Sequence, residues 1–325
     1  MGRVALGQTE MRLSRIGLGT WAFGGGGWPH GWGRQDDADS VATIHAALAA
    51  GVNWIDTAAV YGRGHAEEVV GRALRSLPDD ERPYVFTKAG RQWRPDDLGA
   101  PLQSVLTPEN LARDVEGSLA RLGVERLDLL QVHWPATDGA PVEEYWGHVL
   151  ALRDAGKVRC AGLSNHWLAQ LEAAQAIGQV DSVQLPLSLL KPQARAEAEW
   201  SASHNAGFLA YSPLQSGLLS GRMSNERVAR LPEDDWRRRA PEFAADRLEA
   251  NLHVGAQLAV LARQRGVEAP VLAVAWVLAC PGVTGAIVGA RRPDQVEGWQ
   301  AAMEYEMRPE EAALLAALRD TAVGA

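Results

Sequence analysis

The chain has 325 residues, a mass of 35.0 kDa and a formal net charge of −8. Hydrophobic residues make up 46% of it and charged residues 22%, which excludes a disordered chain, because such chains lack the apolar surface that offsets the entropy of ordering. The acidic balance argues against broad binding to nucleic acid or anionic membrane, and no apolar run is long enough to suggest a membrane span.

The two cysteines, Cys160 and Cys280, both lie in apolar or strand-like segments. This placement favours buried free thiols in a reducing compartment over a disulfide. The first ten residues contain no apolar signal region. We therefore expect a cytoplasmic protein that binds neither nucleic acid nor a membrane.

Short apolar runs of strand type alternate with segments of helical period along the chain. Because such alternation produces parallel strands joined by right-handed crossovers, eight units predict a closed (β/α)8 TIM barrel. A doubly wound open sheet is the structural alternative, but it normally carries an early glycine fingerprint, and the first strand here offers only GLGTW. The predicted strands span residues 16–20, 52–56, 84–88, 127–133, 158–164, 183–185, 208–212 and 285–288.

The segments between these strands have the period of amphipathic helices. One of them has clear ends, because Thr107 is a good N-cap, Pro108 suits the first helical position and Gly123 is a typical C-cap. The predicted helices span residues 39–49, 65–75, 108–122, 142–155, 168–177, 194–204, 249–266, 269–280 and 293–303.

Ahead of the first strand, residues 4–13 alternate around Gly7, which predicts a β-hairpin across the floor of the barrel. Three long insertions, 23–37, 90–106 and 213–247, follow strands. In a barrel of this kind the segments after strands lie at the C-terminal face, where active sites are built. We expect one barrel domain over residues 1–325 with its site at that face.

Four residues of different chemistry lie at or just beyond the ends of early strands: Asp56, Tyr61, Lys88 and His133. These positions converge on one rim of a barrel. A tyrosine beside a lysine–aspartate pair suits general acid–base chemistry, because the ammonium lowers the tyrosine pKa, the carboxylate keeps the lysine charged, and an imidazole can bind a substrate oxygen. Taken singly, each has a plain structural explanation, such as a helix cap, a packed ring or a solvated amine.

The four residues belong to a longer set of motifs: NWIDTA at 53–58, YG at 61–62, TK at 87–88, HWP at 133–135, GLSN at 162–165 and YSPL at 211–214. From about residue 12 to residue 303 the chain resembles the aldo-keto reductase superfamily, whose members are NADP(H)-dependent (β/α)8 barrels. The resemblance implies that Asp56, Tyr61, Lys88 and His133 form the catalytic tetrad, and it implies no metal.

The resemblance also implies a nicotinamide cofactor, with NADP(H) favoured over NAD(H). Ser164, Asn165 and Gln184 match the trio that binds the carboxamide, which needs both donors and acceptors. Arg291 and Arg292 precede a helix N-terminus, where they are expected to neutralise a 2′-phosphate. The other matching positions, for the nicotinamide, its stacking partner and the phosphates, are Thr20, Trp21, Tyr211, Ser212, Leu214, Gln215, Ser216, Arg222, Gly289 and Gln295.

The chain departs from the family pattern at Gly298 and Trp299, where other members carry a Glu and an Asn that hold the adenine. We expect Trp299 to stack on the base instead. Among the twelve tryptophans, several follow strands and are expected to wall an apolar substrate pocket. They are Trp21, Trp28, Trp32, Trp93, Trp134 and Trp167, of which Trp21, Trp28, Trp93 and Trp134 are the candidate pocket residues.

These observations predict an NADP-dependent aldo-keto reductase that reduces an aldehyde or ketone to an alcohol, with Tyr61 as general acid. One alternative is an NADP(H)-binding regulatory subunit with little turnover, resembling the potassium-channel β subunits; the intact tetrad argues against it, since such subunits can lose the histidine. A (β/α)8 hydrolase or isomerase would leave the Ser164, Asn165 and Gln184 trio without a task. A homo-oligomer is compatible with the sequence.

Overall fold

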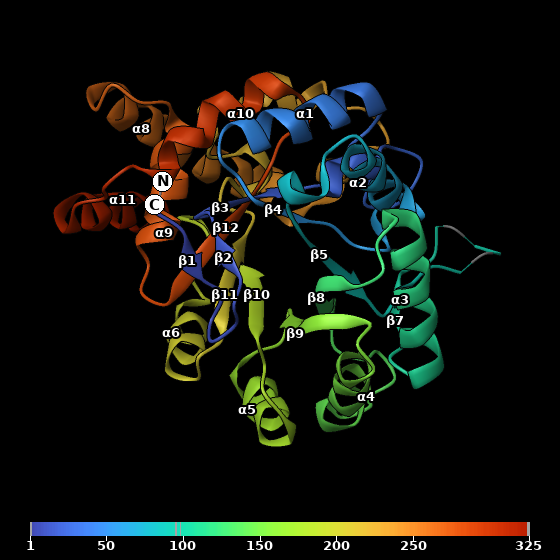
Figure 1. The fold of residues 1–325 in the computed structure, drawn as a ribbon. Helices are drawn as coiled ribbons and strands as arrows, with labels where there is room; N and C mark the ends of the chain where they lie inside the picture. Colours follow the sequence, from blue (N-terminus) through green and yellow to red (C-terminus); the bar gives the residue numbers. More distant parts are fainter. Residues whose placement is uncertain (1, 95, 98, 324–325) are drawn as a thin grey trace.

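The computed structural model describes residues 2–94, 96–97 and 99–323, so residues 95 and 98 of the second predicted insertion lie outside the described residues. Eight parallel strands close into a barrel in the order β10-β11-β12-β3-β4-β5-β8-β9, and helices surround it (Figure 1). The predicted (β/α)8 architecture is confirmed. The barrel strands are β3 (Ile16–Gly19), β4 (Trp54–Asp56), β5 (Tyr84–Ala89), β8 (Leu127–Val132), β9 (Val158–Ser164), β10 (Ser182–Pro186), β11 (Gly207–Tyr211) and β12 (Val283–Gly289).

Each predicted helix is present. The Thr107 side chain caps its helix by accepting from the Asn110 backbone N–H, and Gly123 ends that helix with a left-handed φ of 71°. The helices around the barrel are α1 (Asp37–Ala49), α2 (His65–Arg75), α3 (Pro108–Leu122), α4 (Val142–Asp154), α5 (Leu168–Ile177), α6 (Arg195–Ser203), α8 (Ala245–Gln264), α9 (Ala269–Ala279) and α10 (Pro293–Gln300).

Some elements of the described chain were not predicted. Helix α11 (Pro309–Val323) packs against α8, and its Glu311 pairs with Arg265 at 2.8 Å. Its start carries the usual signals, a proline at the first position followed by two glutamates. Helix α7 (Asn225–Ala229) and the hairpin of β6 (Arg91–Gln92) with β7 (Gln103–Ser104) lie inside the insertions that follow β11 and β5.

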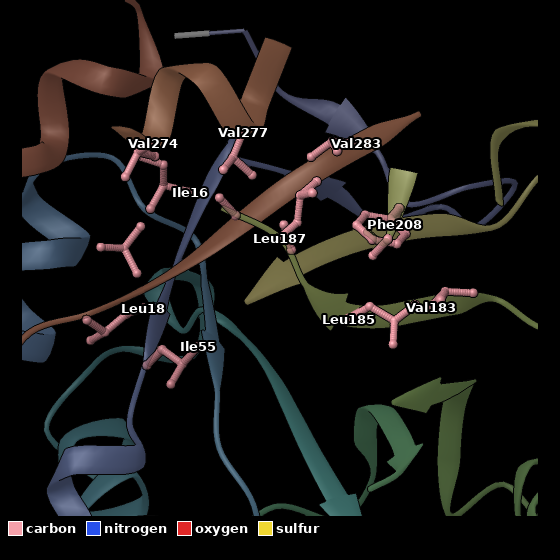
Figure 2. Packing of buried hydrophobic residues seen from close by; sticks show 14 of the residues in the cluster. Ile16, Leu18, Ile55, Val183, Leu185, Leu187, Phe208, Val274, Val277 and Val283 are labelled. Carbon is pink, nitrogen blue, oxygen red and sulfur yellow. The ribbon is translucent and has the colours of Figure 1, made fainter. Parts of the chain in front are cut away.

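One apolar layer lies between the barrel and the helices. Side chains on the outer face of the strands meet α9 there, as Figure 2 shows. This layer explains the strand pattern, because parallel strands covered by helices read as nearly continuous apolar runs. The labelled members are Ile16, Leu18, Ile55, Val183, Leu185, Leu187, Phe208, Val274, Val277 and Val283.

A second apolar cluster fills the barrel interior at its floor. The predicted hairpin is present as β1 (Val4–Ala5) paired with β2 (Arg12–Leu13), and it buries Leu6, Met11 and Leu13 against the inward-facing rings of Trp54 and Phe86. The neighbouring strand makes room with Gly17, since a Cβ there would lie 2.3 Å from the Trp54 indole. The hairpin therefore closes the floor, as the sequence predicts.

Both cysteines are free and buried. Burial raises the pKa of the Cys160 thiol to about 12, which keeps it protonated and unreactive at neutral pH. Within the described ranges, no helix is long and apolar enough to cross a membrane.

Candidate active site

The barrel strands carry polar groups to the C-terminal face. Inward-facing side chains alternate along a strand, so Asp56 lies two residues beyond Trp54 on β4, and Lys88 two residues beyond Phe86 on β5. His133 directly follows β8, where its backbone N–H donates to the Ala89 carbonyl at 3.1 Å. Apolar rings thus occupy the floor, and ionisable groups occupy the rim.

Lys88 and Asp56 form a buried ion pair at this rim. Lys88 Nζ donates to Asp56 Oδ2 at 2.6 Å and to the Thr57 carbonyl at 2.9 Å, and a longer contact of 3.5 Å reaches the hydroxyl of Tyr61. Burial lowers the pKa of Lys88, while the charges of Asp56 and Glu67 oppose that change. Each of the three N–H donors of the ammonium has one of these oxygens as a partner, so Lys88 is held in one geometry.

Tyr61 begins the short helix η2 (Tyr61–Gly64), and its ring is packed within the site. Burial raises the pKa of Tyr61 well above its usual value, and the negative charge of Asp56 adds to this. The expectation that Lys88 lowers the tyrosine pKa below its usual value is therefore not met, because burial and the charge of Asp56 outweigh the nearby ammonium. The phenol is protonated at neutral pH. Because its oxygen accepts from Lys88, its own proton is free to be donated.

His133 packs edge-on against Tyr61, with ring centroids 5.7 Å apart and an interplanar angle of 78°. Burial lowers the pKa of His133 well below its usual value, and the charges of Lys88, Arg91 and His30 lower it further. The imidazole is therefore neutral. Neither ring nitrogen makes a hydrogen bond to a residue in the described ranges, and Nδ1 is fully buried. A neutral ring with a free N–H can donate to a substrate oxygen.

Amide side chains from the neighbouring strands connect to this tetrad. Asn165, in the left-handed region with φ 62°, follows β9; its Nδ2 donates to the His133 carbonyl at 2.9 Å, and its Oδ1 accepts from Tyr211 OH at 2.8 Å. Gln184 on β10 donates from Nε2 to Asp56 Oδ1 at 2.8 Å. The Asn165 backbone N–H also donates to the Gln184 carbonyl at 3.0 Å, so Asn165 and Gln184 join the tetrad in one hydrogen-bonded network.

The groups that remain fit a dinucleotide. Gln184 Oε1 accepts no hydrogen bond within the described part of the chain, so an amide acceptor is left for a ligand N–H2 group. Just after β11, Ser212, Gln215 and Ser216 have φ of 55°, 44° and 55°. Left-handed residues in tight succession are typical of loops that gather backbone N–H groups around phosphate. Gln184 and these serines would hold the nicotinamide and pyrophosphate ends of such a cofactor.

The family model of the Aldo/keto reductase family matches residues 15–320. The chain belongs to the aldo-keto reductase family. It is 35% identical over 299 residues to the aldo-keto reductase YhdN of Bacillus subtilis, with 91% of this chain and 87% of that protein covered. It is 32% identical to the NADH-specific methylglyoxal reductase of Escherichia coli, with 97% of each chain covered. The solved glycerol dehydrogenase of Gluconobacter oxydans is similar in fold, with a TM-score of 0.87, 36% identity and coverage of 99% of this chain and 96% of that one.

In this aldo-keto reductase, Arg291 faces the loop after β3 rather than solvent. Its Nε donates to Gln35 Oε1 at 2.7 Å, its Nη1 to the Trp32 carbonyl at 3.1 Å, and its Nη2 to the Arg34 carbonyl. Gln35 Nε2 returns a bond to the Arg291 carbonyl at 2.9 Å. Arg291 thus anchors this loop, a task that the sequence did not predict.

Two other residues expected near the phosphates, Arg292 and Arg222, lie closer to solvent. Arg292 is exposed and pairs with Asp294 at 3.0 Å, and Arg222 is exposed at 3.9 Å from Glu268. Gln295 instead accepts from the Arg291 backbone N–H at 2.6 Å. Gly289, at the end of β12, is paired with Gly19 of β3. Thr20, expected on the nicotinamide side, is buried, and its Oγ1 donates to the Asp56 carbonyl at 3.0 Å.

The expectation for Trp299 is wrong. Its side chain is only 2% exposed and packs in the apolar layer beneath α10, so the ring cannot stack on an adenine. The helix period explains this, since Trp299 shares the inward face of α10 with Val296. At Gly298, in contrast, an added Cβ would meet open space.

The aromatic wall beside Tyr61 differs from the predicted one. Trp21 stacks on Trp236 with ring centroids 4.9 Å apart, and it packs edge-on against Trp32 with centroids 5.3 Å apart. Its ring centroid lies 6.3 Å from that of Tyr61. Trp32 is one of the tryptophans expected on this rim, whereas Trp236 was not predicted there, because it comes from a separate insertion that only the fold brings next to Trp21. Of the other predicted wall residues, Trp28 is 7% exposed and tucked into its own loop, Trp93 is half-buried and Trp134 is 44% exposed.

Proposed function

We propose that this aldo-keto reductase reduces an aldehyde or ketone to an alcohol with NADP(H) as hydride donor and Tyr61 as general acid. The observation that carries the proposal is the contact between Lys88 Nζ and the Tyr61 hydroxyl, made inside a buried ion pair. A phenol that accepts from an ammonium keeps its proton for another partner, and it yields that proton more readily while the positive charge is near. A regulatory subunit without turnover would not need this arrangement.

Each side chain of the site has a separate role in carbonyl reduction. When bound, the nicotinamide supplies hydride to the carbonyl carbon, while Tyr61 gives its proton from the phenol to the carbonyl oxygen. Neutral His133 donates a hydrogen bond that orients the same oxygen. Lys88 holds the tyrosine oxygen and its positive charge stabilises the phenolate that is left behind, while Asp56 keeps Lys88 in place. The reverse alcohol oxidation uses the same groups in the opposite sense.

The choice between NADP(H) and NAD(H) depends on the arginines before α10. Arg292 supports NADP(H), because it is exposed and its partner Asp294 is exposed as well, so it can turn to a 2′-phosphate. Arg291 is already bonded to the loop after β3 and supplies less support. One relative is named as NADH-specific, so both cofactors belong in every assay.

Small polar carbonyl compounds are the proposed substrates. Two similar proteins carry the names methylglyoxal reductase and glycerol dehydrogenase. We therefore place methylglyoxal first in a panel of aldehydes and ketones, and glycerol first in the oxidation direction.

Reduction of this panel, followed by the loss of reduced-nicotinamide absorbance, tests the function. Tyr61→Phe keeps the ring and removes the proton, so turnover should fall by roughly 10²–10⁴-fold. Cofactor affinity, measured by quenching of tryptophan fluorescence, should stay within about twofold of wild type, because the variant removes no cofactor contact. Wild-type protein that binds cofactor but reduces no compound in the panel would favour the regulatory alternative.

A further inference from the structure

Gln184 joins two parts of the site that face each other across the barrel. It lies on β10, and Asp56 lies on β4, four places away in the closed order of eight strands and therefore on the opposite side. Gln184 Nε2 nevertheless donates to Asp56 Oδ1 at 2.8 Å, and the two residues are 2% and 3% exposed. This hydrogen bond spans the barrel interior, and it holds one oxygen of the carboxylate whose other oxygen holds Lys88.

The direction of the bond leaves one end of the amide free. A carboxylate oxygen only accepts hydrogen bonds, so the Gln184 N–H2 group faces Asp56 and its carbonyl oxygen points elsewhere. That oxygen has no partner among the described residues. An acceptor at this place suits the N–H2 group of a carboxamide, the group that Gln184 is expected to hold by family resemblance.

We propose that Gln184 is a positioning residue that couples binding of the nicotinamide carboxamide to the geometry of the proton-donating tyrosine. The chain of contacts runs from Gln184 through Asp56 to Lys88, which reaches the Tyr61 hydroxyl at 3.5 Å. A partner on the amide oxygen polarises the N–H2 group and strengthens its bond to the carboxylate, because linked hydrogen bonds reinforce one another. This inference rests on the proposed function, since it takes Tyr61 as the acid.

Coupling of this kind runs in both directions, so it is visible in binding alone. Gln184→Met removes both polar ends of the side chain at nearly constant length, and Asp56→Asn removes the charge that the amide faces. With Gln184 present, Asp56→Asn should weaken cofactor binding roughly fivefold, the lower range of coupling between linked sites. In the Gln184→Met background the same change should have no effect. Fluorescence quenching without substrate measures all four proteins.

Equal effects of Asp56→Asn in the two backgrounds would overturn the proposal. If Gln184→Met does not fold, as judged by thermal unfolding of the cofactor-free protein, Gln184→Ser takes its place. A serine at this position leaves room for water around Asp56 but is too short to donate to it, so this second variant should abolish the coupling in the same way.

Kinetics at saturating cofactor separate coupling from simple cofactor binding. Gln184→Met should lower kcat about tenfold even when both ligands saturate, as expected for a lost hydrogen bond to a charged group. Gln131→Met is the matched control, because Gln131 is another buried interior glutamine, bonded to Ser182 at 3.3 Å and not to Asp56. Its kcat should stay near wild type.

A Gln184→Met enzyme whose kcat recovers fully at high cofactor would refute the coupling. Wild-type protein without any turnover would instead contradict the proposed function, while the binding cycle would still decide the coupling.

Discussion

The floor and the rim of the barrel interior come from the same strands, two residues apart, and they are opposite in chemistry. On β4, Trp54 at the floor is followed by Asp56 at the rim, and on β5, Phe86 is followed by Lys88. At the floor the rings of Trp54 and Phe86 lie 5.2 Å apart under the N-terminal hairpin. At the rim, the same strand spacing brings an ammonium within 2.6 Å of a carboxylate.

This difference separates stability from function within one barrel. Burial of an aromatic ring stabilises the fold in proportion to the apolar area removed from water. A buried ion pair gains little net stability, because desolvation of both charges offsets their attraction. The floor therefore stabilises a scaffold that holds the rim charges in place. Changes at the floor should alter unfolding, and changes at the rim should alter chemistry.

The largest effect is expected at the rim, from Lys88→Met. Loss of the ammonium removes the charge that stabilises the phenolate, so turnover should fall by roughly 10²–10⁴-fold. Burial and Asp56 already raise the pKa of Tyr61. Loss of the nearby positive charge should raise it further. Alcohol oxidation, which needs the phenolate, should then begin only at higher pH. Initial rates over a pH series measure both effects, and an unmoved profile would make Lys88 a structural partner only.

At the floor, Phe86→Ala should produce the opposite result. Phe86 is fully buried, so its truncation should lower the free energy of unfolding by about 3–5 kcal/mol through lost burial and a cavity. The kcat of the folded fraction should stay within about threefold of wild type, because the rim groups are untouched. Ile177→Ala, at a 50% exposed apolar residue, is the control and should change stability little. A collapse of kcat in Phe86→Ala would show that floor and rim are not independent.

Local patterns were sufficient to predict the barrel and the positions of its tetrad. Strand and helix periods fix which residues end each strand, and the strand order then brings Asp56, Lys88 and His133 to one rim. The predicted strand and helix ends differ from the observed ones by a few residues, because fraying and loop contacts determine where each element ends. The C-terminal helix α11 was missed although Pro309 marks its start.

Contacts between distant segments could not be predicted in the same way. The bonds of Arg291 depend on where the loop after β3 passes, and the stack of Trp21 on Trp236 depends on where the insertion after β11 passes. The hydrogen bond from Gln184 to Asp56 joins strands 128 residues apart in the chain. Trp299 was the exception, because the helical period places it on the same buried face as Val296.

His166 belongs to neither layer, and its titration should affect stability without changing the rim. Its Nδ1–H donates to the Ser164 carbonyl at 2.7 Å, so its Nε2 accepts from Tyr145 OH at 2.8 Å, and the ring is neutral. Burial lowers the pKa of His166 to about 4, from a usual value of about 6.5. The unfolded chain therefore binds a proton that the folded chain does not. Stability from this residue is present above about pH 6.5 and falls as the pH drops toward 4, by about 3 kcal/mol in all.

Denaturant titrations at a series of pH values measure this loss. His166→Asn cannot take up the proton, so its stability should fall less steeply below about pH 6.5 than that of wild type. The pKa of His133 is lowered too, but it titrates in both proteins and cancels in the comparison. The same acid slope in both would show that His166 does not control this range.

The smallest expected effect lies at the outer edge of the rim, where two adjacent arginines have different surroundings. Arg292→Ala should weaken NADPH binding about tenfold and leave NADH binding unchanged, because only NADPH carries the 2′-phosphate that an exposed guanidinium can reach. Arg291→Ala removes three bonds to the loop after β3, so it should weaken both cofactors alike and lower the thermal stability of the protein. Fluorescence quenching with each cofactor separates the two cases. If Arg291→Ala selectively weakened NADPH binding and Arg292→Ala did not, Arg291 rather than Arg292 would be assigned to the 2′-phosphate. Equal binding of both cofactors to Arg292→Ala and to wild type would remove the support for NADP(H) and favour NAD(H).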